Sequence, residues 1–315
     1  MSESARPVLV ATPAMADETR PILASLIGAD YSSRAITPQR SDLAPGVVRE
    51  AFSRLATWDA SRGTDVSAWC VHDRGDAGAR RLATWEEAFG AIAGLAAKAH
   101  SDSSFVIGLG GDHSVSWPLI ATAREAVRVR KGEGARLGVV QLDVHHDVRS
   151  LDRGPSNGTP MRGLIETGVI DARDLVQIGI HPFGNARELT EYCDSIGIRR
   201  FSIADVLTDG VEMTARRTLT GLLKDVDAIY LTVDIDVLDR AFAPGTGAAL
   251  PGGLDPRRLV ELVEFICTDA RTVALDVVEF DPERDVSSTT AANVAYVVMA
   301  AVAALARRTA LPGNA

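Results

Sequence analysis

The 315-residue sequence contains only three cysteines, far apart from one another: Cys70, Cys193 and Cys267. An odd number of widely spaced cysteines excludes a disulfide framework and a Cys-x-x-Cys metal site. The same pattern favours a reducing, cytoplasmic setting. Basic residues are not in excess either, because 33 Lys and Arg stand against 42 Asp and Glu, for a formal net charge of −9. We therefore expect no nucleic-acid partner, since nucleic-acid-binding proteins usually carry a basic face.

Targeting signals and long apolar runs are also missing. Residues 1–10 show no basic segment followed by an apolar one, so we expect no secretory signal. The longest apolar run, residues 291–306, is shorter than the roughly 18 to 20 residues of a membrane-spanning helix, and it contains Asn293. We interpret it as a buried core helix and expect no membrane partner. With 46% apolar residues the composition is globular, and we predict one domain over residues 1–315, with residues 1–30 partly an N-terminal extension.

Apolar, β-branched stretches alternate with longer segments of helical periodicity. Five stretches are predicted as strands: residues 104–109, 137–142, 175–180, 228–233 and 272–278. Six segments are predicted as helices: residues 85–100, 115–129, 185–196, 212–223, 256–268 and 289–308. The strands are apolar throughout, which is typical of strands covered on both faces. The pattern predicts a three-layer α/β/α fold with a central, mostly parallel sheet, in which residues 1–30 and 40–46 form surface loops.

Polar side chains collect where four of these strands end. In chain order they are His113, Asp143, His145, Asp147, Asp234, Asp236 and Glu279. Ligands of open parallel sheets bind beyond the carboxyl ends of the strands, so we expect these side chains to share one site. The i, i+2, i+4 spacing of Asp143, His145 and Asp147 points all three to one side of an extended chain. Carboxylates this close repel one another without cations, and a mixed oxygen and imidazole set favours Mn²⁺, Zn²⁺ or Fe²⁺. Six ligands suit a pair of ions about 3.5 to 4 Å apart.

Three motifs at these strand ends resemble those of the ureohydrolases, a family that includes arginase, agmatinase and formimidoylglutamase. They are GGDHS at 110–114, DVHHD at 143–147 and DIDVLDRAFAPGTG at 234–247, and the resemblance extends from roughly residue 35 to residue 305. It implies an arginase-like fold, two Mn²⁺ per chain and a homo-oligomer, either a trimer or a hexamer. The implied metal ligands are His113, Asp143, His145, Asp147, Asp234 and Asp236, with Asp143 and Asp234 bridging the ions. His146 stands at a variable position and is not assigned to metal.

Departures from the arginase pattern narrow the range of expected substrates. Asn157 stands where arginase-like members have a histidine, and Arg149 where arginase has a small polar residue. With Arg162 and the segment IGIHPFGN at 178–185, these residues resemble formimidoylglutamases most closely, although Thr246 stands near a position where that subgroup has a cysteine. Arginine offers a planar fork for a carboxylate, and formimidoylglutamate carries two. We therefore assign Arg149, Asn157 and Arg162 to substrate binding.

The resemblance implies a hydrolase that acts on C–N bonds of linear amidines. The expected reaction converts N-formimidoyl-L-glutamate and water to L-glutamate and formamide, a step of histidine degradation. A metal-activated water would attack the amidine carbon, with Asp147 as the proton carrier and Glu279 as the carboxylate that binds the amidinium. An agmatinase or a guanidino-acid hydrolase, which would release urea, is the alternative. A further alternative is a catalytically silent metal-binding homologue, which the complete ligand set disfavours.

Overall fold

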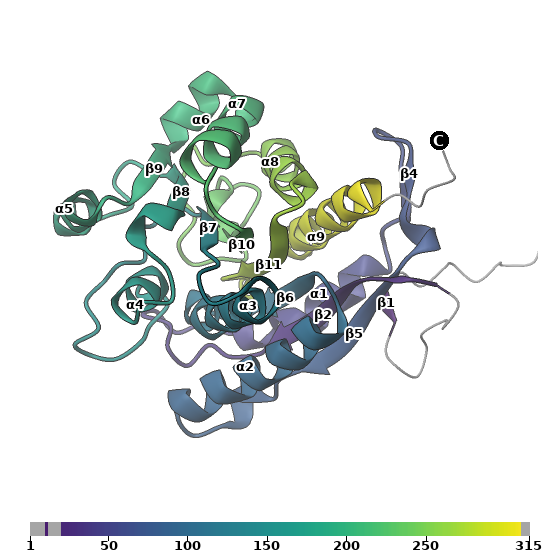
Figure 1. Cartoon of the computed structure of the whole chain (residues 1–315), viewed down its shortest axis with the longest axis horizontal. Coiled ribbons are helices and arrows are strands. Elements are labelled where there is room, and N and C mark those ends of the chain that lie inside the picture. Colours follow the sequence, from purple (N-terminus) through teal and green to yellow (C-terminus); the bar gives the residue numbers. More distant parts are fainter. Residues whose placement is uncertain (1–9, 12–19, 310–315) are drawn as a thin grey trace, which may run out of the picture.

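A nine-stranded sheet forms the centre of the computed structural model, which describes residues 10–11 and 20–309 (Figure 1). In spatial order the strands are β1 (Val10–Ala11), β5 (Cys70–Asp76), β2 (Ile22–Ala29), β6 (Val106–Gly110), β11 (Thr272–Val278), β10 (Ala228–Asp234), β7 (Leu137–Leu142), β8 (Leu175–Ile180) and β9 (Arg199–Ser202). Every neighbouring pair in this sheet is parallel. A separate antiparallel hairpin pairs β3 (Trp58–Asp59) with β4 (Thr64–Asp65). The predicted central parallel sheet is confirmed.

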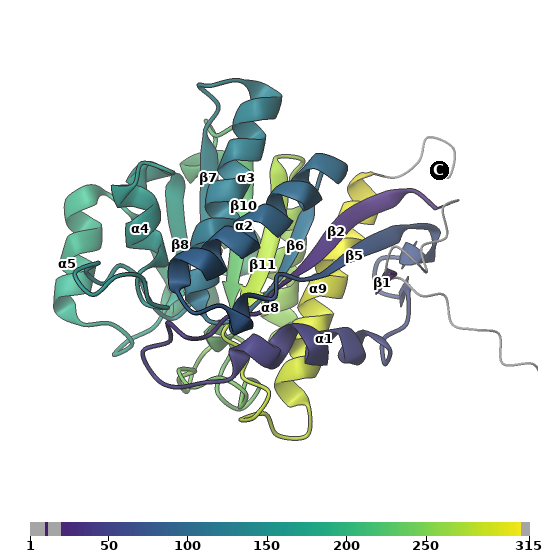
Figure 2. The ribbon, with the colours of Figure 1, turned by 90° about the horizontal axis from the view of Figure 1, so that it is seen from below.

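Helices cover both faces of the sheet and complete the three layers (Figure 2). One face carries α1 (Ala44–Phe52), α6 (Ile203–Asp209), α7 (Val211–Arg216), α8 (Pro256–Thr268) and α9 (Thr289–Arg308), and the other carries α2 (Trp85–Asp102), α3 (Ser116–Lys131), α4 (Pro160–Glu166) and α5 (Arg187–Ile196). Each face of the sheet therefore has its own apolar core. Along β7, Val140 and Leu142 belong to the core under α8 and α9, and Leu137 and Val139 belong to the core under α2 and α3. Because both faces are buried, such strands are apolar at every position.

The apolar run at 291–306 lies within α9. This helix has 20 residues and is long and apolar enough to cross a membrane by length and composition alone. However, 72% of its apolar window is buried, and the helix packs against α1 and α8. The prediction of a core helix is therefore confirmed.

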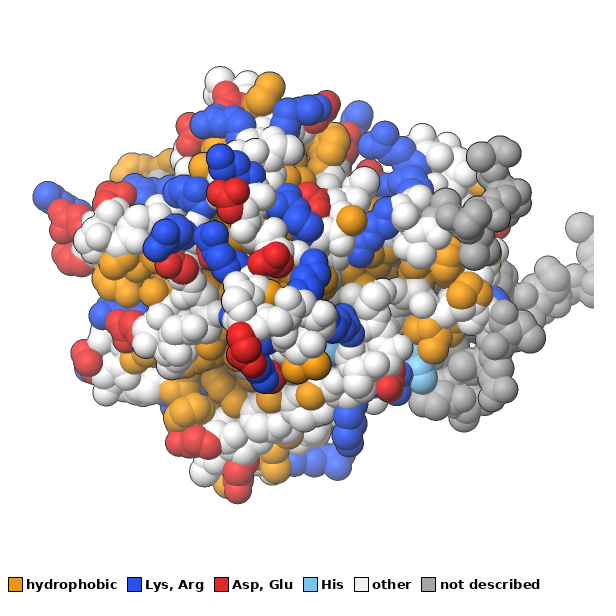
Figure 3. All heavy atoms as spheres, viewed as in Figure 1, with side chains coloured by type: hydrophobic (Ala, Val, Ile, Leu, Met, Phe, Trp, Pro, Cys, Tyr) orange, Lys and Arg blue, Asp and Glu red, His pale blue; other side chains and the backbone are white. Residues whose placement is uncertain are grey.

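Acidic and basic side chains are interspersed over the face shown in Figure 3. Several arginines on helices pair with a glutamate one turn away, as in Arg187–Glu191, Arg216–Glu212 and Arg257–Glu261. Exposed pairs of this kind contribute little to stability, so the fold depends mainly on its two apolar cores.

Two segments that were predicted as surface loops are regular structure. Within the first 30 residues, β2 runs between β5 and β6, whereas positions 1–9 and 12–19 lie outside the described residues. Residues 41–52 form a short 3-10 helix (Ser41–Leu43) followed by α1. The loop prediction was wrong for β2 because its alanine, serine and glycine residues weaken the strand pattern in the sequence. The strand forms by pairing with β6, which lies far from it in the sequence.

Candidate metal centre and substrate cavity

Four neighbouring strands, β6, β11, β10 and β7, bring the predicted residues to one edge of the sheet. His113 begins a 3-10 turn just after β6, Asp143 follows β7 directly, Asp234 is the last residue of β10, and Glu279 follows β11. Parallel strands that point the same way end on the same edge. Residues as distant in sequence as His113 and Glu279, 166 positions apart, therefore lie in contact.

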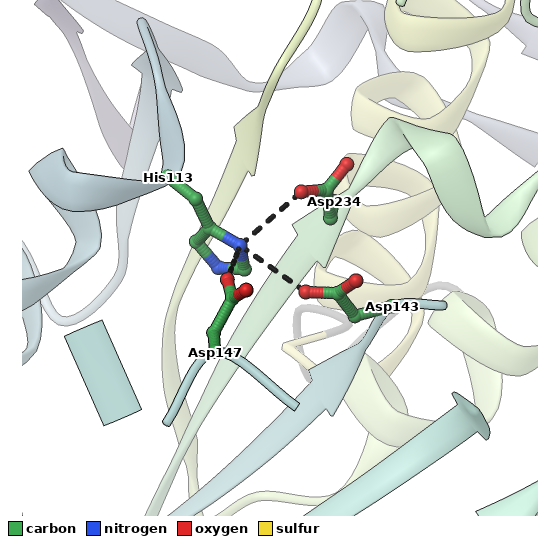
Figure 4. A group of neighbouring side chains, drawn as sticks. All are labelled: His113, Asp143, Asp147 and Asp234. Atoms are coloured by element: carbon green, nitrogen blue, oxygen red, sulfur yellow. Dashed lines mark ion pairs between the residues drawn. The ribbon is translucent and has the colours of Figure 1, made fainter. Parts of the chain in front are cut away.

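The six predicted ligands form two overlapping groups, in each of which the donor atoms lie within 4.8 Å of one another. The inner group consists of His113, Asp143, Asp147 and Asp234, and the outer group of Asp143, His145 and Asp236. In the inner group (Figure 4), His113 Nδ1 lies 2.7 Å from Asp147 Oδ2 and 3.2 Å from one oxygen each of Asp143 and Asp234. In the outer group, His145 Nδ1 lies 3.0 Å from Asp236 Oδ2.

Asp143 belongs to both groups because its two oxygens face different histidines. Oδ2 lies 3.2 Å from His113 Nδ1, and Oδ1 lies 3.4 Å from His145 Nδ1. This geometry suits a carboxylate that bridges two ions, the role implied for Asp143. Asp234, the other implied bridge, faces only the inner group through Oδ2, while its Oδ1 accepts a hydrogen bond from the Asp236 N–H at 2.9 Å.

Tight turns bring the ligands of each motif together. Asp143 Oδ1 accepts the His145 N–H at 2.6 Å, just as Asp234 Oδ1 accepts the Asp236 N–H. These Asx turns fold the chain back on itself where a strand ends. The extended geometry predicted for the DVHHD motif is therefore wrong. Asp147 itself has a φ of +53°, a left-handed conformation that costs a non-glycine residue on the order of 1–3 kcal/mol and that is enriched at functional sites.

Burial raises the pKa of Asp147, Asp234 and Asp236, whereas His113 and His145 lower the pKa of Asp143 despite its burial. Burial, with the neighbouring Asp143 carboxylate, raises the pKa of Asp147 to about 7. Burial, with the Asp236 and Asp143 carboxylates, raises the pKa of Asp234 well above its usual value. Burial alone would lower the pKa of His145, but the Asp236 and Asp143 carboxylates outweigh it and raise that pKa to about 12. Without cations, these groups must therefore retain protons near neutral pH.

Two buried atoms and one histidine tautomer fit bound cations. His113 Nδ1 and Asp236 Oδ2 are buried and make no hydrogen bond within the described part of the chain. His113 Nε2 lies 3.1 Å from Thr232 Oγ1, and this hydroxyl donates to Asp276 Oδ1 at 2.6 Å. A hydroxyl has a single hydrogen, so His113 must donate its Nε2–H to Thr232, and in the neutral imidazole the lone pair is then on Nδ1, which faces the carboxylates. This tautomer and the mixed donor set suit divalent transition-metal ions.

Glu279 lies beside the inner group and is 4% exposed, with a φ of +66°. Its Oε1 accepts the His113 N–H at 2.6 Å and Asn157 Nδ2 at 3.2 Å, and its Oε2 accepts Gln39 Nε2 at 2.8 Å. Burial raises the pKa of Glu279 despite these donors. The structure thus brings the predicted Glu279 and Asn157 together. Gln39 was missed, because nothing in its local sequence distinguishes it from other loop residues.

A polar cavity of about 200 Å³ lies over both groups. Its lining includes His145, Asp147, Asp234, Asp236, Glu279, Gln39, Asn157 and Arg149. The Arg149 side chain is exposed and makes no hydrogen bond or ion pair with the described residues, whereas its backbone N–H donates to Gly158 O at 2.8 Å. Gly158 permits this approach, because a Cβ there would lie 2.7 Å from Arg149 Cδ. Arg149 is therefore a cation available to a ligand.

Arg162 does not reach the cavity. Its Nε donates to Glu166 Oε1 at 2.6 Å within α4, and its guanidinium lies 4.4 Å from the ring centre of Tyr192 on α5. The α4 helix turns this side chain toward α5, so the structure does not support its assignment to substrate binding. His146 lies outside both metal groups, in agreement with its exclusion from the predicted ligands.

Comparison with known proteins covers most of the chain, because the arginase family model matches residues 23–304. The chain belongs to the arginase family. A formimidoylglutamase from Halalkalibacterium halodurans is 34% identical over 284 residues, which cover 87% of this chain and 84% of the relative. The crystal structure of formimidoylglutamase from Bacillus subtilis matches with a TM-score of 0.84 and 29% identity, over 94% of this chain and 90% of that one. Proclavaminate amidino hydrolase from Streptomyces clavuligerus matches with a TM-score of 0.77 and 28% identity, over 92% and 93%. The predicted family and the arginase-like fold are confirmed.

Proposed function

We propose that this arginase-family protein hydrolyses N-formimidoyl-L-glutamate to L-glutamate and formamide. One observation carries the proposal: a buried carboxylate, Glu279, and a cation that pairs with no described residue, Arg149, line the same cavity over the metal groups. A carboxylate suits the amidinium end of this substrate, and a planar arginine fork suits a carboxylate at its other end. The relatives named formimidoylglutamase support the same substrate.

Two Mn²⁺ per chain belong to this proposal. The inner ion would be held by His113, Asp143, Asp147 and Asp234, and the outer ion by Asp143, His145 and Asp236, with Asp143 bridging; the resemblance adds Asp234 as a second bridge. When bound, the ions lower the pKa of a water molecule and stabilise developing negative charge. The free Nδ1 lone pair of His113 and the shared position of Asp143 support this arrangement.

The protein's own residues would bind the substrate and move a proton. Glu279 accepts a hydrogen bond from the amidinium N–H, and Gln39 and Asn157 fix its carboxylate at 2.8 and 3.2 Å. Asp147 accepts the proton that the attacking water loses and passes it to the glutamate nitrogen as the C–N bond breaks. Arg149 binds a carboxylate of the substrate by charge-assisted hydrogen bonds.

A homo-oligomer, either a trimer or a hexamer, and a cytoplasmic location are also proposed. The resemblance to the ureohydrolases supports the oligomer. The three cysteines are buried and form no disulfide with one another, which supports a reducing setting. Light scattering after size-exclusion chromatography tests the assembly, and a monomer in solution would contradict it.

A substrate panel tests the function. The manganese-loaded protein is incubated with N-formimidoyl-L-glutamate, agmatine and 4-guanidinobutyrate, and formamide, urea and glutamate are measured separately. We expect formamide and glutamate in equal amounts from the first compound and far slower urea release from the others. Faster turnover of agmatine would contradict the substrate assignment and would favour the urea-releasing alternative.

A further inference from the structure

Two glutamines interrupt otherwise apolar strands beside the metal groups. Gln141 on β7 and Gln177 on β8 are direct partners in the parallel ladder, and both are fully buried. A buried amide is costly unless its donors and acceptor are all hydrogen-bonded. Both amides meet this condition, because Gln177 Nε2 donates to Gln141 Oε1 at 2.8 Å and to the His146 carbonyl at 2.7 Å, while Gln141 Nε2 donates to Asp143 Oδ2 at 2.7 Å and to the His145 carbonyl at 3.3 Å.

His146 extends this chain of hydrogen bonds to helix α5. Its Nδ1 lies 2.7 Å from Gln177 Oε1, and its Nε2 lies 3.1 Å from Thr190 Oγ1. An amide oxygen can only accept, so Nδ1 must carry the hydrogen and Nε2 must accept the Thr190 hydroxyl. Every bond of the chain then donates toward Asp143, and reversing either amide would place two donors or two acceptors against each other.

The end of the chain is the carboxylate that both metal groups share. Gln141 binds Asp143 Oδ2, the oxygen that faces His113, while the His145 N–H binds Oδ1. Both oxygens are therefore oriented by donors from the protein. The inner group has its own support, because His113 is oriented separately through Thr232 and Asp276.

We propose that Gln141, Gln177 and His146 are positioning residues that hold Asp143 in the orientation in which it serves both metal groups, with Thr190 fixing the tautomer of His146. This inference rests on the proposed metal pair but not on the proposed substrate. Loss of this chain of hydrogen bonds weakens the binding of both ions, whereas loss of the Thr232 hydroxyl weakens the binding of the inner ion only. Outer hydrogen-bond partners of metal ligands typically change metal affinity by about 10- to 100-fold.

The test is a Mn²⁺ titration in which electron paramagnetic resonance measures the concentration of the free ion. This measurement does not depend on turnover. Gln177→Met keeps the side-chain length and interrupts the chain of hydrogen bonds that leads from Thr190 to Asp143, which we call the relay. We expect both ions to bind about 10- to 100-fold more weakly to this variant. Thr232→Val should weaken one ion. Wild-type affinity for both ions in Gln177→Met would overturn the proposal, and so would weakening of only one ion.

A milder pair of variants separates positioning from folding. Thr190→Val removes only the hydroxyl at the far end of the chain, and Thr190→Ser restores it. We expect a several-fold weakening of both ions in the first and recovery in the second. Thr122→Val on α3 is the matched control, because among the residues that the structure describes the Thr122 hydroxyl binds only the Pro118 carbonyl of its own helix. Equal affinities in Thr190→Val and Thr122→Val would overturn the relay even if Gln177→Met did not fold.

The failure of this proposal differs from the failure of the proposed function. If the wild type binds two ions, and both bind more weakly to Gln177→Met and Thr190→Val, the relay is supported even if the protein releases urea rather than formamide. A wild-type protein that binds no Mn²⁺ would overturn both the metal pair and the relay.

Discussion

The inner and outer metal groups are built at the same edge of the sheet but differ in the depth of their histidines. Asx turns at two strand ends join the outer ligands His145 and Asp236 to Asp143 and to Asp234, respectively. However, the His113 side chain is 1% exposed and the His145 side chain is 29% exposed. The substrate cavity is lined by His145 and not by His113. Asp147 and Asp234 of the inner group also line this cavity, so the two groups differ in exposure mainly through their histidines. Asp143 joins the two.

Replacing the shared ligand should have the largest effect. Asp143→Asn removes a charge from both groups, so we expect the dialysed protein to lose both equivalents of Mn²⁺ and all measurable formamide release. Metal analysis and product assay check this. The matched control is Asp171→Asn, which changes an exposed aspartate that caps a 3-10 turn. Retention of one full equivalent would show that the groups do not depend on a shared carboxylate.

Exchanging one histidine at a time should separate the groups. His113→Ala should leave about one equivalent of Mn²⁺, retained by the outer group, and His145→Ala should leave the inner ion. Because the inner histidine is buried and the outer one is partly exposed, chelator should remove the remaining ion faster from His113→Ala than from His145→Ala. Stopped-flow release into a chelator measures this. Equal release rates would remove the distinction between inner and outer sites.

Asp147 and Glu279 should affect turnover for different reasons, since Asp147 belongs to the inner group and Glu279 to neither. Asp147→Asn removes the proton carrier and a metal charge, so kcat should fall by about 10²- to 10⁴-fold. Glu279→Gln should leave two equivalents of Mn²⁺ in place and lower kcat/KM through amidinium binding. Metal analysis beside steady-state kinetics separates them. Wild-type kinetics in either variant would exclude that residue from the mechanism.

The smallest expected effect lies outside both groups. Arg149→Ala should keep both ions and lower kcat/KM for N-formimidoyl-L-glutamate by about 10- to 150-fold, the loss of one charge-assisted contact worth roughly 1.5–3 kcal/mol. A carboxylate-free amidine such as formamidine should be turned over equally by wild type and variant. Arg162→Ala is the matched control, because that arginine binds Glu166 and Tyr192 instead. Equal losses on both substrates would assign Arg149 a structural role.

Most of the sheet and all six candidate ligands could be predicted from the sequence, while whole elements could not. Strands β7, β8 and β11 have the predicted bounds, because a strand buried on both faces is a continuous apolar run. Strands β5, with the sequence CVHDRGD, and β9, with RRFS, were missed, because polar strands at or near the sheet edge lack that run.

The sequence by itself determined the chemistry of the site, because ligand types and their i, i+2 spacing are local properties. Only the tertiary structure decided how these residues divide into two groups, since this depends on the strand order β6-β11-β10-β7. It also decided that Gln39 binds Glu279 across 240 positions of sequence and that Arg149, unlike Arg162, faces the cavity. Such contacts depend on how distant strands and helices pack, and a local pattern of residues carries no record of that packing.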